Sequence, residues 1–211
     1  MNVNQTIWKL LQADIAIQKD MWRNLINTRA LAKYLIDKHS LRVSLDSVIS
    51  SIRRYQSQTT FEEDEKNLHN IFSEAVVSTK NNLACITASV PANTFFTRVC
   101  KLQKTPSFRI ATGEHELKIL VENPHAESLK QLFGKDELES VETDLSEVNV
   151  TVSEKAVHTK GVLARIASEL ALANINIHEI ITVPPEFLIY VKQKDIVRTH
   201  ESILKLSQES D

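Results

Sequence analysis

The range 148–206 constrains the fold of this 211-residue chain most, because a strand pattern there leads through a glycine into an amphipathic helix, two more strands and a final helix. Alternating apolar and polar residues at 148–153 are typical of a half-buried strand. After Gly161, apolar residues recur three and four positions apart, as on one face of a helix. Two apolar runs within 175–191 meet at a pair of prolines, and Asp195 is a candidate N-cap for the last helix. The order βαββα indicates an α+β fold.

Two runs within this range resemble a known family. They are TKGVLARI at 159–166 and LALANINI at 170–177. Both are similar to the ACT domain, and the likeness is closest to the regulatory ACT domains of aspartate kinases. The resemblance implies a ferredoxin-like βαββαβ module that pairs with another copy through sheet edges or helices. It also implies an amino acid or related metabolite as the ligand, bound at the turn between the first strand and the first helix.

By its position in the family, the ligand is expected at that turn, with three polar residues across the pocket. The candidate ligand-binding residues are His158, Thr159, Lys160, Gly161, Val162, Leu163, Asn174, Asn176 and His178. The chemistry of the turn agrees with this role, because a helix N-terminus offers unpaired N–H groups to a carboxylate and a glycine lets a ligand approach the backbone. The alternative is structural. Gly161 can serve backbone geometry alone, the two asparagines suit a helix-to-strand turn, and histidines are more often exposed or hydrogen-bonded than bound to a ligand.

A second, diverged ACT-like unit is predicted before this module. Its expected elements are a strand at 83–90, a helix at 92–102, strands at 108–111 and 117–121, a helix at 126–133 and a strand at 138–145. The unit lacks a counterpart to Gly161 and to the Asn-Ile-Asn-Ile run, so no ligand-binding residues are assigned to it. Its expected role is that of a pseudosymmetric partner.

The C-terminal module has no fourth strand of its own, because its last helix ends near Leu206. A spare strand at 75–80 can complete it, as in the interlocked ACT pair of aspartate kinases. An edge left open would instead invite pairing with another chain. From the resemblance we also expect a homodimer through the ACT domains.

The N-terminal part of the chain differs in charge. Residues 1–60 hold nine Lys or Arg and four Asp, whereas the whole chain has a net charge of −2. The sequence predicts three helices: one over 5–24, one capped by Asn27 and one capped by Ser44. In the second helix Leu31, Tyr34 and Leu35 are expected inward, and in the third Leu45, Val48, Ile49 and Ile52 are expected to face the core. The range 27–55 resembles winged helix-turn-helix domains, although no β-hairpin wing follows it.

The expected recognition helix exposes small and basic residues. The candidate DNA-binding residues are Lys38, Arg42, Ser47, Ser50, Ser51, Arg53 and Arg54. Small polar side chains let a helix enter the major groove, and the cations can meet phosphates or guanine edges. The alternative is a solvated helix in a small helical dimerisation domain.

These patterns divide the chain into a helix-turn-helix-like domain at 1–58, a linker helix at 59–74, a diverged ACT-like domain at 75–146 and an ACT domain at 147–211. With three glycines, the sequence has no Walker loop, no G-x-G-x-x-G turn and no G-x-S-x-G elbow. Cys85 and Cys100 lack the spacing of a zinc site or a disulfide framework, which suits a cytoplasmic protein. We expect no metal, no cofactor and no membrane-spanning segment.

No nucleophile, base and orienting residue fall at a recognisable spacing, so we do not expect an enzyme. The sequence therefore predicts an amino-acid-responsive regulatory protein that binds DNA and regulates transcription. The alternative function is a stand-alone ACT regulatory subunit that docks on an amino-acid biosynthetic enzyme through the helical domain.

Overall fold

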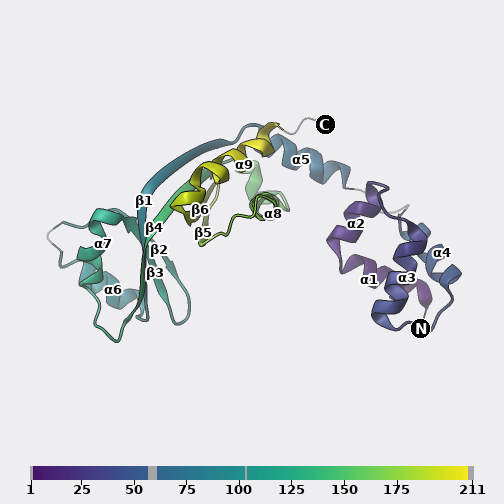
Figure 1. Ribbon diagram of the computed structural model, residues 1–211, viewed down its shortest axis with the longest axis horizontal. Helices are drawn as coiled ribbons and strands as arrows, with labels where there is room; N and C mark the ends of the chain where they lie inside the picture. The colour runs from purple at the N-terminus through teal and green to yellow at the C-terminus, as the bar shows by residue number, and fades with distance from the viewer. Residues whose placement is uncertain (1, 57–60, 103, 209–211) are drawn as a thin grey trace. The chain divides into compact units, whose positions relative to one another are not determined.

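The computed structural model describes residues 2–56, 61–102 and 104–208. The chain divides into two compact units, Met1–Lys66 and Asn67–Asp211, which we call the helical unit and the sheet unit (Figure 1). The boundary predicted at 58 lies outside the described residues. The helix expected as a linker begins in the helical unit and ends in the sheet unit. No helix in the described ranges is long and apolar enough to cross a membrane.

The helical unit contains more helices than the sequence predicts. Its elements are α1 (Val3–Gln12), α2 (Ile15–Trp22), α3 (Thr28–His39), α4 (Leu45–Gln56) and the beginning of α5 (Glu62–Ser73). The single helix predicted over 5–24 is wrong. Asp14 interrupts it, because its carboxylate accepts the backbone N–H groups of Ala16 and Ile17, both at 3.1 Å, and so caps α2.

The caps predicted for the next two helices are present. Asn27 Oδ1 accepts the backbone N–H groups of Arg29 and Ala30, and the Ser44 hydroxyl accepts that of Ser47. The core between α1, α3 and α4 is built from apolar residues at helical spacing, among them Ile7, Leu11, Leu31, Leu35, Val48 and Ile52. The inward position predicted for Tyr34 is wrong, since this residue is 46% exposed. The described part of this unit contains helices only.

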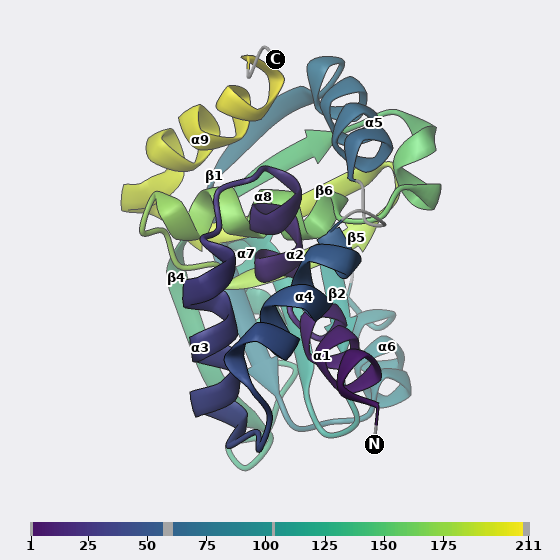
Figure 2. The ribbon, with the colours of Figure 1, turned by 90° about the vertical axis from the view of Figure 1, so that its right-hand side faces the viewer.

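The sheet unit contains one six-stranded antiparallel sheet in the order β2-β3-β1-β4-β6-β5. Its strands are β1 (Val76–Ala88), β2 (Phe108–Thr112), β3 (Leu117–Glu122), β4 (Leu138–Thr151), β5 (Glu179–Val183) and β6 (Glu186–Lys192). Its helices are α6 (Ala92–Val99), α7 (Asn123–Lys130), α8 (Val162–Leu172) and α9 (Ile196–Gln208), with two 3₁₀ helices, η1 (Glu154–His158) and η2 (Gln193–Asp195). The C-terminal helix α9 lies along β1 and β4 (Figures 1 and 2).

Two long strands run through both halves of this sheet. The second part of β1 pairs with β3 and with the first part of β4, which gives the first half. The first part of β1, Val76–Lys80, pairs with Thr151–Glu147 of β4 and so supplies the strand that the C-terminal module lacks. The boundary predicted at 146 therefore lies inside β4. The strands predicted separately at 75–80 and 83–90 are one strand, with a register shift between Lys80 and Leu83.

Each half buries its helix-facing side in a core of its own. In the first half, Ile86, Phe95 and Ile119 lie between the sheet and α6 and α7. In the second half, Val148, Ile166 and other apolar residues pack with α8 and α9. The C-terminal part of α5 joins this second core through Leu68, Ile71 and Phe72.

The opposite side of the sheet is also buried. Leu83, Cys85 and Leu120 of the first half form one cluster with Leu145, Leu188 and Tyr190 of the second half. Successive side chains of a strand point to opposite faces, so these residues cannot belong to the helix-covered cores. The two half-sheets therefore face each other across this cluster.

Candidate functional site

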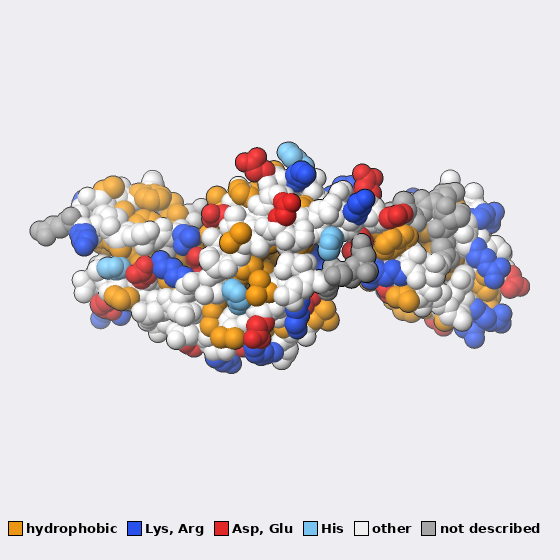
Figure 3. Space-filling view, turned by 90° about the horizontal axis from the view of Figure 1, so that it is seen from above, with side chains coloured by type: hydrophobic (Ala, Val, Ile, Leu, Met, Phe, Trp, Pro, Cys, Tyr) orange, Lys and Arg blue, Asp and Glu red, His pale blue; other side chains and the backbone are white. Residues whose placement is uncertain are grey.

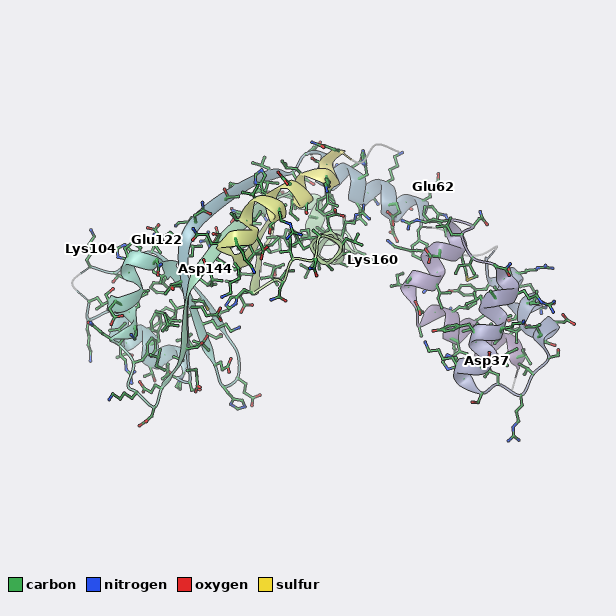
Figure 4. All side chains as sticks on the ribbon, viewed as in Figure 1. Asp37, Glu62, Lys104, Glu122, Asp144 and Lys160 are labelled. Carbon is green, nitrogen blue, oxygen red and sulfur yellow. The ribbon has the colours of Figure 1, made fainter. Side chains whose placement is uncertain are left out.

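The turn before α8 is longer and more ordered than the sequence predicts. After β4, the chain forms η1 and then reaches Thr159, whose hydroxyl donates to Lys155 O at 3.0 Å and whose N–H donates to Ala156 O at 3.2 Å. His158 and Lys160 are exposed, and Figure 4 labels Lys160 beside the start of α8. The turn thus presents two basic side chains to solvent and holds Thr159 in place.

Gly161 has a structural reason to be glycine. Its φ is +88°, in the left-handed region that L-residues rarely adopt. A Cβ at this position would lie 3.6 Å from Leu68 Cδ1 on α5, which is ordinary van der Waals contact. The side of Gly161 at which a ligand was expected to approach the backbone therefore faces α5. This geometry agrees with the alternative in which the glycine serves backbone conformation.

The structure does not bring all the candidate ligand-binding residues together. The residues at 158–163 precede α8 and those at 174–178 follow it, and an 11-residue helix is about 16 Å long. Val162 is buried in the core, whereas Leu163 is 41% exposed. Asn174 adopts a left-handed φ of 54°, as a helix-to-strand turn requires. Asn176 is exposed in the same turn.

His178 belongs to a different environment. Its backbone N–H donates to Tyr190 O at 2.8 Å, and its Nδ1 lies 3.6 Å from Glu142 Oε2. Lys192 Nζ also approaches Glu142, at 2.5 Å, and lowers the pKa of that carboxyl through the hydrogen bond. His178 thus lies at the start of β5, at the opposite end of α8 from Gly161.

A polar cavity of about 290 Å³ lies beside the turn, between η1 and the C-terminal part of α5. The loop side contributes Ser153, Lys155 and Thr159, and the α5 side contributes Asn67, Asn70 and Glu74. Thr159 is the only residue of the predicted ligand set among the residues that line it. The sequence did not predict the α5 side, because 59–74 was interpreted as a linker helix, although polar residues recur there three and four positions apart, at Asn67, Asn70 and Glu74.

A second polar cluster joins the facing half-sheets. Arg109 Nη1 lies 2.9 Å from Glu147 Oε2, and the Tyr190 hydroxyl donates to the same oxygen at 2.6 Å. Burial and this hydrogen bond raise the pKa of Tyr190 far above its ordinary value. Lys118 of β3 and Glu179 of β5 form a further ion pair at 2.8 Å, which raises the pKa of the lysine. No sequence pattern singled out these residues. Glu147 and Tyr190 are direct partners on β4 and β6, but Arg109 and Glu147, like Lys118 and Glu179, come from strands that are not neighbours in the sheet.

On the helical unit, most of the candidate DNA-binding residues lie on the surface. Ser47, Ser50, Arg53 and Arg54 of α4 are exposed, as are Lys38 and Arg42. Figure 3 shows Lys and Arg side chains on the surface of this unit. Ser51 is an error of the sequence analysis. It is buried, and its carbonyl accepts the indole N–H of Trp8 at 3.1 Å.

Ser51 is buried because it lies three positions after Val48 and four before Tyr55, which puts it on the apolar face of α4. Two of the exposed cations make local contacts. Lys38 Nζ donates to the Tyr34 hydroxyl at 2.6 Å, and Arg54 donates to Asn4 Oδ1 at 3.0 Å. In the part of the chain that the structure describes, no group of three or more His, Cys, Asp or Glu residues is placed to hold a metal ion.

Comparison with known proteins shows a likeness of fold. No family model matches the sequence, and no curated protein matches it. Among solved structures, the regulatory subunit of aspartate kinase from Thermus thermophilus in its ligand-free form aligns over 62% of this chain and 95% of its own, with 14% identity and a TM-score of 0.53. The aspartokinase alpha and beta subunits align over 63% and 97%, with 16% identity and a TM-score of 0.54.

Aspartate kinase from Synechocystis aligns over 79% of this chain and 32% of its own, with 18% identity and a TM-score of 0.55. This chain therefore spans about a third of that kinase. At these identities the likeness is one of fold. The chain has a mixed α/β fold with an antiparallel sheet, similar to that of the regulatory subunit of aspartate kinase.

Proposed function

We propose that this protein is an amino-acid-responsive regulator, in which the sheet unit binds the effector and the helical unit acts on DNA. The observation that carries the first part is the interlocked pair of βαββαβ halves, in which Val76–Lys80 completes the second half. The protein from Thermus thermophilus with this fold is a regulatory subunit of aspartate kinase. The polar cavity beside Thr159 supports a small, hydrophilic effector.

The exposed face of α4 supports the second part. Ser47 and Ser50 are small, so the helix backbone can approach the floor of a major groove, and Arg53 lies beside them with its side chain exposed. The helical unit also carries the excess of basic residues within the first 60 positions. Lys38 and Arg42, at the end of α3 and after it, are exposed cations that can contact phosphates.

Thermodynamic linkage couples effector binding by the sheet unit to DNA binding by the helical unit. An effector that binds one arrangement of the protein more tightly than another shifts the population toward that arrangement. If the favoured arrangement also has a different affinity for DNA, effector and DNA each change the affinity of the other by the same factor. Couplings of about 1–3 kcal/mol are typical.

Thermal unfolding of the full chain against each of the twenty amino acids tests the effector role. At about 100 times its dissociation constant, a ligand of the native state adds about 2.7 kcal/mol, which raises the melting temperature of a chain of this size by several degrees. We expect such a shift with one amino acid or a small chemical group of them. If none of the twenty shifts the transition, the amino-acid-responsive role is wrong.

The second candidate function is a regulatory subunit that docks on a biosynthetic enzyme through the helical unit. Apolar residues exposed on this unit favour it, among them Ile15 at 58% and Leu25 at 70%. The salt dependence of binding to a random-sequence duplex separates the two functions. Phosphate contacts lower log affinity with log salt at a slope of about −0.9 for each contact. An absence of salt-dependent DNA binding would favour the docking function.

A further inference from the structure

The cavity between α5 and η1 differs from the site that sequence analysis assigned. Its walls come from two segments that are far apart in the chain: Asn67, Asn70 and Glu74 on one side, and Ser153, Lys155 and Thr159 on the other. The α5 wall lies outside both βαββαβ halves. A molecule in this cavity would therefore contact a structural element that the ACT-type fold does not itself contain.

The size of the cavity limits what can fill it. Its volume of about 290 Å³ lies at the lower end of ligand sites, since pockets for drug-sized molecules hold about 300–1,000 Å³. Ile71 supplies the apolar part of the lining, and it belongs to the buried core. The lining is thus suited to a small hydrophilic molecule and offers little apolar surface to a large side chain or an aromatic ring.

The charges in the cavity are separated between its two walls. Lys155 carries a positive charge on the loop wall, and Glu74 carries a negative charge on the α5 wall. Both side chains are exposed, and within the described ranges neither has an ion-pair partner. A free α-amino acid has a carboxylate and an ammonium group on one carbon. Its carboxylate can pair with one cation of a site, and its ammonium group can pair with one anion. The amides of Asn67 and Asn70 can donate to and accept from a polar side chain.

We propose that this cavity is the effector site and that it takes a small, polar α-amino acid, with the carboxylate at Lys155 and the ammonium group at Glu74. The proposal rests on the proposed function, because it places the effector of the regulator. Thr159 and Ser153 contribute hydroxyl groups to the same wall as Lys155. Thr159 already donates to Lys155 O, so its oxygen remains available as an acceptor.

The site gives the effector a direct route to the helical unit. The same α5 that lines the cavity begins at Glu62, where Glu65 pairs with Lys19 of α2 at 2.6 Å within the helical unit. Its C-terminal part is held in the sheet unit by Leu68, Ile71 and Phe72. An amino acid that contacts both walls stabilises the docking of this part of α5 on the sheet unit. Binding therefore acts on the helix that continues into the helical unit.

Calorimetric titration of the full chain with each of the twenty amino acids tests the site, with two pairs of matched variants. Lys155→Met and Glu74→Gln each remove a charge from the cavity. Lys194→Met and Glu154→Gln remove the same charges from exposed residues that do not line it. We expect the first pair to weaken binding of the effector at least tenfold each and the second pair to leave it unchanged.

Unchanged affinity in both Lys155→Met and Glu74→Gln, with wild-type protein still binding an amino acid, would overturn this site and leave the amino-acid-responsive role standing. Failure of the wild type to bind any amino acid would overturn both. All four residues are exposed, so the variants are expected to fold, and their unfolding transitions check this. Hydrogen exchange gives a second measurement. The amides of Leu68–Ser73 should exchange more slowly with the amino acid bound, and unchanged exchange on binding would also overturn the proposal.

Discussion

Arg109 of β2 and Glu147 of β4 form an ion pair at 2.9 Å, although two strands separate them in the sheet. The contact exists because the sheet folds so that its halves face each other across Leu83, Leu145 and the rest of the shared cluster. Glu147 is almost completely buried and also accepts the hydroxyl of Tyr190. The carboxylate therefore has two partners from different strands, and the polar cluster fixes how one half lies against the other.

Removal of Arg109 should destabilise the sheet unit. In Arg109→Ala, the Glu147 carboxylate stays buried with Tyr190 as its donor, and leaving a buried charged acceptor partly unsatisfied costs about 1–3 kcal/mol. We expect the double variant Arg109→Ala/Glu147→Gln to recover part of this loss, because its buried group is neutral. Urea unfolding of the full chain measures the free energy of unfolding of the single and the double variant. Equal stability of Arg109→Ala and wild type would contradict the structural role of the pair.

The Glu137 carboxyl should make stability depend on pH in the acid range. Hydrogen bonds from Arg98 and from the Gly134 N–H lower its pKa from 4.5 to about 2. A carboxyl whose pKa is lowered by folding contributes stability that is present above the unfolded pKa and is lost as pH falls through the folded pKa. The contribution is therefore full above about pH 4.5 and disappears toward pH 2.

Glu137→Gln isolates this contribution. We expect the variant to be less stable than wild type at pH 7, and the difference between them to shrink as the pH falls from about 4.5 to about 2. Glu154→Gln, which removes the charge of an exposed carboxyl in η1, is the matched control for the change of charge. Urea titrations at a series of pH values give the result. A difference that is independent of pH over this range would refute the ion-pair effect.

Substitution of Gly161 separates backbone conformation from ligand approach. An alanine held at φ +88° lies in the left-handed region, which lowers the free energy of unfolding by about 1–2 kcal/mol, whereas Asn tolerates that region better. Among the residues that the structure describes, a Cβ here would contact Leu68 Cδ1 at 3.6 Å, an ordinary van der Waals distance, so we expect neither variant to clash. We expect Gly161→Ala to unfold at lower urea concentration than Gly161→Asn. Effector affinity should be retained in Gly161→Asn, and its loss there would show that the ligand needs the bare backbone.

Ser51→Ala tests which face of α4 meets DNA. The buried Ser51 hydroxyl has no hydrogen-bond partner among the residues described, so its removal should leave the free energy of unfolding equal or raise it by up to about 1 kcal/mol. DNA affinity should not change. Arg53→Ala changes an exposed residue of the same helix. In this variant the affinity for DNA should fall, and the slope of log affinity against log salt concentration should become shallower by about 0.9. Weaker DNA binding by Ser51→Ala at unchanged stability would contradict the orientation of α4.

Local chemistry made two helix caps predictable. Asn27 and Ser44 have side chains that accept N–H groups at helix starts, and this preference is independent of tertiary context. Periodicity also located Val48 and Ile52 among the buried positions of α4, but not Ser51 or Tyr55. It failed for Tyr34, whose spacing fits the apolar face but whose ring lies at the surface beside Lys38. A ring with a polar end can occupy either environment, so spacing alone does not decide it.

Contacts between distant segments were not predictable in this way. The polar face of α5 at Asn67 and Asn70 becomes a cavity wall only because η1 lies opposite it, and nothing in the sequence near residue 155 indicates that neighbour. The pairing of Arg109 with Glu147 likewise depends on how the halves fold against each other. The strand at 75–80 could be proposed because the C-terminal module needed a fourth strand, and Val76–Lys80 lies beside β4 in the structure.

The affinity of the full chain for DNA, with and without an amino acid, is the most direct test of the proposed coupling between the sheet unit and the helical unit. A duplex selected from a random-sequence library serves as the probe, and fluorescence anisotropy at fixed salt gives both dissociation constants. If effector binding and DNA binding are coupled, the saturating amino acid changes the affinity by about 5- to 150-fold, which corresponds to a coupling of about 1–3 kcal/mol. Equal dissociation constants with and without a bound amino acid would contradict it.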